Sequence, residues 1–232
     1  LCLARAGRGL LFAVLDDLAR GVRVFFGPAL VFDPGRVKKI LAIRLDRVGD
    51  VVLTTPALRA IKETYPFCRL TVLARRYTRD LLDGLSFVDE VVCLEDFSRE
   101  DFISYLRNRH FDVTLGFHPD VLVNRIAAWS KAPWRVGYAF AGSGIFLTRA
   151  LADDRDRRLR HEVLSALEVV GIIGARTADT SLSIPVCPEA EAFAEAFFRE
   201  RGLAGIRVAA VHPGSRQTYI RWPAERFAEL SE

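Results

Sequence analysis

The chain has 232 residues, 50% of them hydrophobic and 27% charged, which suffices for one buried domain and part of another and excludes overall disorder. With 33 Lys+Arg against 29 Asp+Glu, the net charge of +4 suits a phosphorylated or lipid partner and is too mild to indicate nucleic acid. The sequence contains no methionine, not even at position 1, so we expect a fragment of a longer translation product.

The first segment, residues 1–37, mixes leucine and phenylalanine with arginine and is predicted to form an amphipathic helix. Such a helix either packs on its own domain or lies in a membrane interface, and both interpretations stay open. Arg20, Arg23 and Asp33 interrupt the apolar runs, so no membrane-spanning helix is predicted. The four cysteines are far apart and lack C-x-x-C spacing, which indicates reduced core thiols in a cytoplasmic protein.

From Lys39 onward, apolar runs alternate with segments of helical period, which predicts βαβ units and therefore an α/β fold with a Rossmann-like parallel sheet. The predicted strands are residues 40–45, 70–74, 88–94 and 113–116. The predicted helices between and after them are residues 51–65, 79–84, 99–109 and 121–131.

The remainder of the chain is predicted to start a second domain. A loop at 141–160, rich in glycine and charge, is a candidate mobile segment and precedes a helix at 161–173. A further helix at 189–201 leads to a buried strand at 206–211, and a last helix opens at Pro223. We therefore expect a first domain at 38–204 and the incomplete start of a second at 205–232.

The most informative motif joins the first strand to the first helix and reads Arg-Leu-Asp-Arg-Val-Gly-Asp over residues 44–50. This corner lies at the carboxyl end of a parallel sheet, where open α/β folds bind their ligands. The carboxylate of Asp50 is suited there to take a proton from an acceptor hydroxyl, as a general base. Its alternative role is that of a helix N-cap.

The motif continues to Pro56-Ala57-Leu58, and the whole resembles the opening motif of the ADP-heptose:lipopolysaccharide heptosyltransferases, glycosyltransferase family 9. Further stretches resemble that family's landmarks in the same order and extend the resemblance over residues 38–232. They are Arg135-Val136-Gly137-Tyr138, Leu147-Thr148-Arg149, Arg160-His161-Glu162-Val163, His212-Pro213-Gly214-Ser215 and Arg221-Trp222-Pro223.

The resemblance implies the N-terminal domain of a two-domain GT-B glycosyltransferase with its second domain truncated. It implies an inverting, metal-independent transfer of a heptose or related sugar from a nucleotide-sugar, ADP-heptose in that family, to a lipopolysaccharide core or similar glycolipid. Asp50 matches the family's proposed catalytic base. A cytoplasmic enzyme is implied, peripheral on the inner membrane, and the 232 residues alone are expected to be inactive because GT-B domains close around both substrates.

The donor is expected to contact Gly49, which allows close backbone approach, and the turn after the last predicted strand. Backbone amides of that turn can cradle a diphosphate and Arg221 can add positive charge, although an ordinary strand-to-helix turn explains the same residues. The family commonly has lysine before Arg-Trp-Pro, where this chain has Ile220. The expected donor residues of this turn are His212, Gly214, Ser215 and Arg221.

Polar residues that follow the strands are expected to bind the anionic acceptor at the same edge as Asp50. Ordinary solvated loops explain each of them equally well. The segment from Gly116 to Asp120 departs from the family's usual D-x-Q/R-G pattern, which leaves the acceptor open. The expected acceptor residues are Arg47, Arg75, Arg76, His118, Asp120 and Arg125.

No metal site and no cofactor are predicted. The letters Asp154-Arg155-Asp156 match the metal-binding D-x-D signature but lie in a dense charge cluster, which we interpret as solvated, and Glu162 is interpreted as a favourable first-turn acid. The motifs of dinucleotide oxidoreductases, P-loop NTPases and α/β-hydrolases are missing. The rival to a transferase is a non-catalytic module of Rossmann-like fold that binds acceptor or membrane.

Overall fold

The structure is a computed structural model and describes residues 32–153, 160–215, 219 and 221–231. The chain divides into two compact units, residues 1–185 and 186–232. The N-terminal helix expected within 1–37, apart from its last residues, the D-x-D letters at 154–156 and Ile220 lie outside the described residues. Within the described part, no helix combines the length and apolar character needed to cross a membrane.

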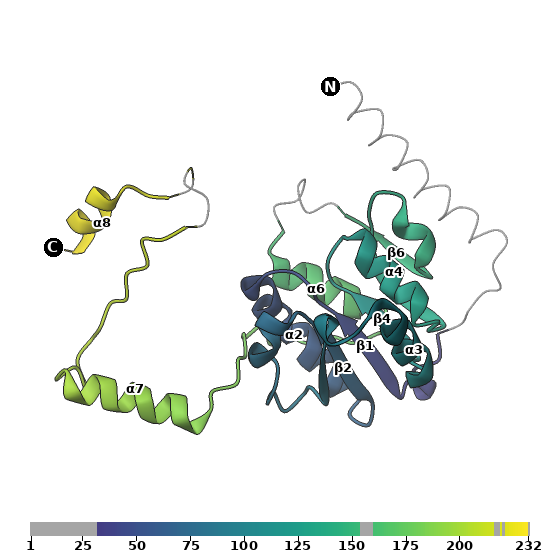
Figure 1. The fold of residues 1–232 in the computed structure, drawn as a ribbon, viewed down its shortest axis with the longest axis horizontal. Helices are drawn as coiled ribbons and strands as arrows, with labels where there is room; N and C mark the ends of the chain where they lie inside the picture. The colour runs from purple at the N-terminus through teal and green to yellow at the C-terminus, as the bar shows by residue number, and fades with distance from the viewer. Residues whose placement is uncertain (1–31, 154–159, 216–218, 220, 232) are drawn as a thin grey trace, which may run out of the picture. The chain divides into compact units, whose positions relative to one another are not determined.

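The first unit is built around a six-stranded, fully parallel sheet in the order β3-β2-β1-β4-β5-β6 (Figure 1). This confirms the predicted α/β, Rossmann-like fold. The strands are β1 Lys39–Ile43, β2 Arg69–Ala74, β3 Glu90–Cys93, β4 Val113–Gly116, β5 Trp134–Ala139 and β6 Arg149–Ala152.

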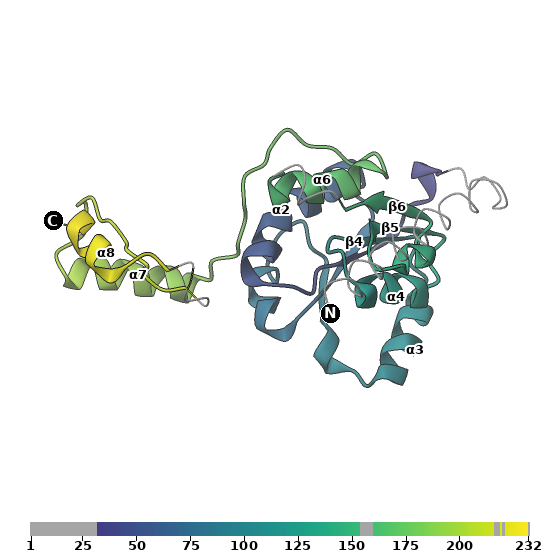
Figure 2. The same ribbon diagram turned by 90° about the horizontal axis from the view of Figure 1, so that it is seen from above.

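Helices cover both faces of this sheet, with α2 and α6 on one side and α3 and α4 on the other (Figure 2). They are α2 Val48–Thr64, α3 Arg99–Arg109, α4 Val121–Trp129 and α6 Glu162–Gly171. Short 3-10 helices fill the connections at η1 Pro34–Arg36, η2 Arg76–Leu81, η3 Leu94–Asp96 and η4 Ser143–Phe146.

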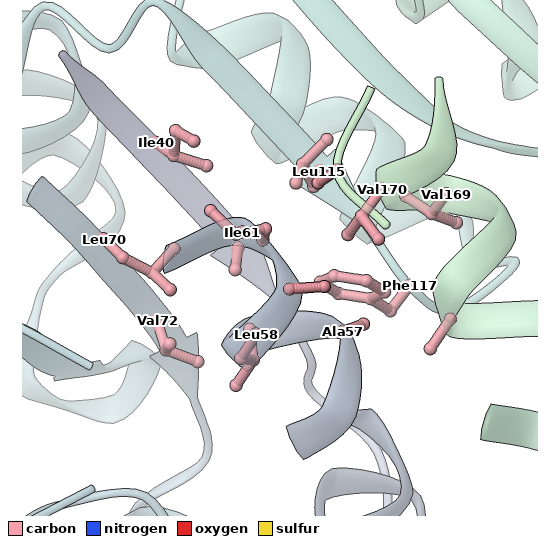
Figure 3. Close-up of a cluster of buried hydrophobic side chains, with 14 of the residues drawn as sticks. Ile40, Ala57, Leu58, Ile61, Leu70, Val72, Leu115, Phe117, Val169 and Val170 are labelled. Carbon is pink, nitrogen blue, oxygen red and sulfur yellow. The ribbon is translucent and has the colours of Figure 1, made fainter. Parts of the chain in front are cut away.

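The main core lies between the sheet and the pair α2 and α6. Figure 3 shows Leu58 and Ile61 of α2 pointing at β1 and β2, while Phe117 lies between α2 and α6. Burial of each such leucine or isoleucine contributes roughly 1.5–3 kcal/mol, so this core fixes where the N-termini of α2 and α6 lie. The opposite face is closed by a second cluster around Phe102, Leu106 and Ile126.

Helix α2 tolerates an internal proline because a neighbouring side chain replaces the lost hydrogen bond. Pro56 has no N–H to donate to the carbonyl of Val52, four residues earlier. The hydroxyl of Thr55 donates to that carbonyl at 2.7 Å instead. The helix therefore runs unbroken from the candidate site to Thr64.

Three sequence predictions need correction in the first unit and one in the second. The helix expected at 79–84 is instead the 3-10 helix η2 at Arg76–Leu81. In its first turn, the hydroxyl of Thr78 donates a hydrogen bond to the carbonyl of Arg75. Strand β5 was not predicted as a strand, and the loop expected at 141–160 contains η4 and strand β6. The strand expected at 206–211 is not formed.

The second unit contains α7 Pro188–Glu200 and α8 Ala224–Ser231. Residues 206–211 between them are exposed and without regular structure, because the described part of this unit has no other strand with which they can pair. The assignment of 205–232 to the start of a donor-binding domain stays a prediction.

Candidate functional site

The site lies where the strand order reverses. Strand β1 pairs with β2 on one side and with β4 on the other. The chain runs outward from β1 through β2 to β3 and then crosses back to β4, so the loops after β1 and β4 flank a topological switch point. Open α/β sheets bind their ligands at this point, at the carboxyl ends of the strands. The loop after β1 holds Arg44 and Asp46, the first turn of α2 holds Asp50, and the loop after β4 holds His118.

A buried cation occupies the centre of this edge. The side chain of Arg44 is only 1% exposed, and one of its terminal nitrogens, Nη1, donates to the carbonyl of Phe117 at 2.9 Å. Both terminal nitrogens donate to Glu162 Oε1, at 3.1 and 3.0 Å. Arg44 thus ties the end of β1 to the end of β4 and to the first turn of α6.

Two further carboxylates surround the same guanidinium. Arg44 Nε lies 2.7 Å from Asp46 Oδ1, a close ion pair whose atoms are not aligned for a hydrogen bond. Arg44 Nη2 lies 3.6 Å from Asp50 Oδ1, which is beyond hydrogen-bond distance. One cation therefore faces three acidic side chains, so the cluster is electronegative.

Asp50 is in the first turn of α2, and its side chain is 34% exposed. The N-cap of α2 is Arg47, so Asp50 is not the N-cap that the alternative interpretation required. Its carboxylate accepts no hydrogen bond from the described residues, and its one ion pair there is with Arg44. The carboxylate is thus anchored on one side and open to solvent on the other.

Asp46 also links the loops after β1 and β4. Its Oδ2 lies 3.2 Å from Nδ1 of His118. Burial raises the pKa of Asp46, and the nearby Asp50 adds to this, while Arg44 and His118 act in the opposite direction. Because the pKa of Asp46 is higher in the folded than in the unfolded state, the folded state binds the proton more tightly. The free energy of unfolding therefore falls as the pH rises above the ordinary value of 3.8 and through the raised pKa.

The expected acceptor residues are only partly assembled at this edge. His118 joins the cluster through Asp46, and Arg47 is exposed at the start of α2. Arg75 contacts the carbonyl of Leu45 and Glu95, and Arg76 pairs with Asp96 at 2.7 Å, so both guanidinium groups have acidic partners.

Asp120 and Arg125 have structural contacts. The carboxylate of Asp120 caps α4 by accepting from the amides of Leu122 and Val123. Arg125 stacks over the ring of Trp129 on the same helix. Gly49 has an ordinary negative φ, so its backbone does not require glycine. A Cβ built at this position meets no atom within 4 Å, so the space beside Gly49 in the first turn of α2 is open.

The expected donor residues other than Gly49 belong to the second unit. His212 and Gly214 are exposed, and the two are close, since a Cβ on Gly214 would lie 3.2 Å from the imidazole ring. Arg221 Nε donates to the carbonyl of Ser215 at 2.5 Å. These contacts hold the turn together within its own unit.

Sequence reasoning missed two members of the cluster and misread a third. Arg44 and Asp46 stand inside the motif that identified Asp50, yet neither was assigned a role. Glu162 was interpreted only as a helix-start residue, while its carboxylate contacts Arg44 from 118 residues along the chain. The signal that could have identified Glu162 is its position in Arg160-His161-Glu162-Val163, one of the stretches that resemble the heptosyltransferases.

Surface cavities and metal ligands do not add to this site. Cavities of 320, 470 and 340 Å³ lie around the amino-terminal ends of the strands, lined by residues such as Trp134, Lys131 and Lys39. None of these three is lined by Arg44, Asp50 or Glu162. Among the residues that the structure describes, no group of three or more His, Cys, Asp or Glu side chains is placed to hold a metal.

Known proteins resemble the chain in fold and, at low identity, in sequence. No protein-family model matches the chain. A curated relative, "Putative glycosyltransferase" from Haemophilus influenzae, is 27% identical over 132 residues, which are 54% of this chain and 38% of that protein. The crystal structure of the glycosyl transferase family 9 from Veillonella parvula superposes with a TM-score of 0.69 at 27% identity, covering 84% of this chain and 58% of that one.

Two Escherichia coli structures share the fold at lower identity. ADP-heptose lps heptosyltransferase II has a TM-score of 0.63 at 20% identity, covering 83% of this chain and 60% of that one. Heptosyltransferase WaaC with ADP-2-deoxy-2-fluoro heptose has a TM-score of 0.56 at 18% identity, covering 83% and 64%. The chain thus spans between 38% and 64% of the lengths of these four proteins. The chain is thus similar in fold and sequence to a family 9 glycosyltransferase, and it shares a Rossmann-like fold with two heptosyltransferases.

Proposed function

We propose that the complete protein is an inverting, metal-independent glycosyltransferase that moves a heptose or related sugar from a nucleotide-sugar to a lipopolysaccharide core or similar glycolipid. The observation that carries the proposal is the open carboxylate of Asp50 at the topological switch point of a sheet shared with family 9 glycosyltransferases. In this proposal the acceptor hydroxyl lies beside Asp50, at the strand ends where open α/β sheets bind their ligands.

The proposed reaction is a single displacement. The acceptor oxygen attacks the anomeric carbon of the donor sugar while Asp50 takes the hydroxyl proton. The new C–O bond forms on the face opposite the leaving group, and the nucleoside diphosphate departs with the electron pair of the broken bond. The configuration at the anomeric carbon is therefore inverted.

The donor is proposed to be a nucleotide-sugar, in keeping with the ADP-2-deoxy-2-fluoro heptose and the ADP in two WaaC structures of the same fold. In this proposal the turn with His212, Gly214 and Ser215 binds the diphosphate, and Arg221 supplies positive charge. His118 and Arg47 contact the acceptor from the loops after β4 and β1. The enzyme would work at the cytoplasmic face of the inner membrane, where a glycolipid acceptor is accessible.

The test is a transfer assay with the complete gene product. It is supplied with ADP-heptose or another nucleotide-sugar and with lipid A–Kdo, and both nucleotide release and product mass are followed. We expect transfer with inverted anomeric configuration and no loss of rate after EDTA treatment. The 232 residues alone are expected to form no product.

Retained configuration, or inactivation by EDTA that Mg²⁺ restores, would contradict the proposed mechanism. Binding to lipid A–Kdo vesicles without transfer from any nucleotide-sugar would instead support the non-catalytic module.

A further inference from the structure

The hydrogen bonds of Arg44 are distributed unequally among its acidic neighbours. Glu162 Oε1 receives both terminal nitrogens, at 3.1 and 3.0 Å, while Asp50 stays 3.6 Å from Nη2. Nη1 also serves the carbonyl of Phe117. Nη2, the terminal nitrogen nearest Asp50, therefore donates to Glu162 and not to Asp50.

This distribution matters for a base. A hydrogen bond from a guanidinium to a carboxylate favours the charged form of the acid and makes the carboxylate a weaker proton acceptor. At 3.6 Å, the carboxylate of Asp50 is attracted and oriented by the charge of Arg44 but accepts no hydrogen bond from it. Its lone pairs stay available for the proton of a substrate hydroxyl.

We propose that Glu162 is a positioning residue that occupies the guanidinium of Arg44 and so keeps Asp50 free to act as the base. The inference rests on the proposed function, because it assigns a task to Glu162 only if Asp50 accepts a proton. When an uncharged amide replaces the carboxylate of residue 162, the terminal nitrogens of Arg44 lose a charged acceptor and turn to Asp50, which keeps its charge.

The packing of α6 makes this arrangement rigid. Glu162 is the first residue of α6, whose N-cap is the imidazole of His161, accepting from the amide of Val163 at 3.3 Å. Val169 and Val170 anchor the same helix in the main core (Figure 3). The Glu162 side chain is 19% exposed, so it is held at Arg44 by the helix that carries it.

The direct structural test is a crystal structure of the E162Q variant. The inference predicts that the distance from Arg44 Nη2 to Asp50 Oδ1 contracts from 3.6 Å to hydrogen-bond length. An unchanged separation of these atoms overturns it. This measurement needs no substrate, so it stands apart from the proposed function.

The kinetic test uses the complete gene product with ADP-heptose and lipid A–Kdo. For E162Q we expect kcat to fall about tenfold or more with both KM values little changed, since only the transition-state proton transfer is weakened. E162D, which keeps the charge, should restore part of the rate.

The control is E100Q, which removes the same charge from the first turn of α3, where Glu100 is exposed and away from Arg44. It should leave kcat unchanged. Among the described residues, the other charged groups of this cluster are Arg44, Asp46 and His118, and none is altered in either variant. If E162Q does not fold, E162D is compared with wild type in the same assays.

An unchanged kcat or a change in KM alone overturns the inference. The outcomes also separate it from the proposed function. If D50N is inactive and E162Q is fully active, only the role of Glu162 fails. If D50N keeps its turnover, Asp50 is not the base and the proposed mechanism fails first.

Discussion

At the scale of single residues, Arg44 determines the character of the site. A guanidinium that is 1% exposed needs its charge paired and acceptors for its N–H groups. Asp46, Asp50 and Glu162 pair the charge, and Glu162 and the carbonyl of Phe117 accept from the two terminal nitrogens. Nε lies beside Asp46 without the alignment of a hydrogen bond. The acids in turn depend on Arg44, because no second buried cation stands among them in the described residues.

Replacing Arg44 by methionine tests this mutual dependence. We expect R44M to lower the free energy of unfolding by about 3–5 kcal/mol at neutral pH, because buried acids lose their partner. Without Arg44, the pKa of Asp46 rises further above 3.8, so the folded state binds a proton more tightly than the unfolded state. The deficit should therefore shrink as the pH is lowered from 7.5 to 5.

Urea unfolding of wild type and R44M at both pH values measures this difference. R76M is the control, because Arg76 is 67% exposed and pairs only at the surface. A deficit for R44M that is independent of pH would show that lost packing, not unpaired charge, determines it.

At the scale of elements, the parallel sheet was predictable because its buried strands are short, almost wholly apolar runs in the sequence. The predicted bounds of one strand and one helix agree with the structure, at Val113–Gly116 and Arg99–Arg109. Strand β6 was missed because its sequence, Arg-Ala-Leu-Ala, is short and only partly buried at the sheet edge. Its pairing with β5 is a tertiary fact that local pattern does not contain.

Helix α2 connects the site to the segment that leaves the first unit. Arg59 donates to the carbonyls of Asp179 and Ser181 at 3.1 and 2.8 Å and pairs with the Asp179 carboxylate at 3.0 Å. The hydroxyl of Thr55 accepts from the amide of Ser183. These contacts hold residues 179–183 against the helix that carries Asp50.

We expect R59A to release this segment. The loss of two hydrogen bonds to backbone and one ion pair should cost about 1–2 kcal/mol of local stability. Amide exchange of Ser181 and Ser183, followed by mass spectrometry, should accelerate roughly five- to thirtyfold in R59A. R79A, which removes an exposed pair with Asp83, should leave exchange there unchanged. Equal exchange in R59A and wild type would contradict the account of α2.

At the scale of the whole molecule, the sequence predicted the place of the candidate site more completely than the residues that form it. Asp50 and His118 were expected at one edge because the carboxyl ends of parallel strands meet there, and the structure places both at that edge. Glu162 was not, because its contact depends on how α6 packs beside α2, a feature set by the core and not by local pattern. The strand expected at 206–211 failed because a strand needs neighbours, and residues 186–215, 219 and 221–231 supply none.

The central claim is that the carboxylate of Asp50 receives the acceptor's proton. The most direct measurement compares wild type, D50N and D101N as complete gene products, under single-turnover conditions with saturating ADP-heptose and lipid A–Kdo. Asp101 occupies the same position in the first turn of α3 as Asp50 does in α2, so D101N is a matched control. We predict that D50N binds lipid A–Kdo as wild type does and transfers at least a hundredfold more slowly, in line with the loss of a general base, while D101N transfers at the wild-type rate. Transfer by D50N within a few-fold of wild type would contradict the account.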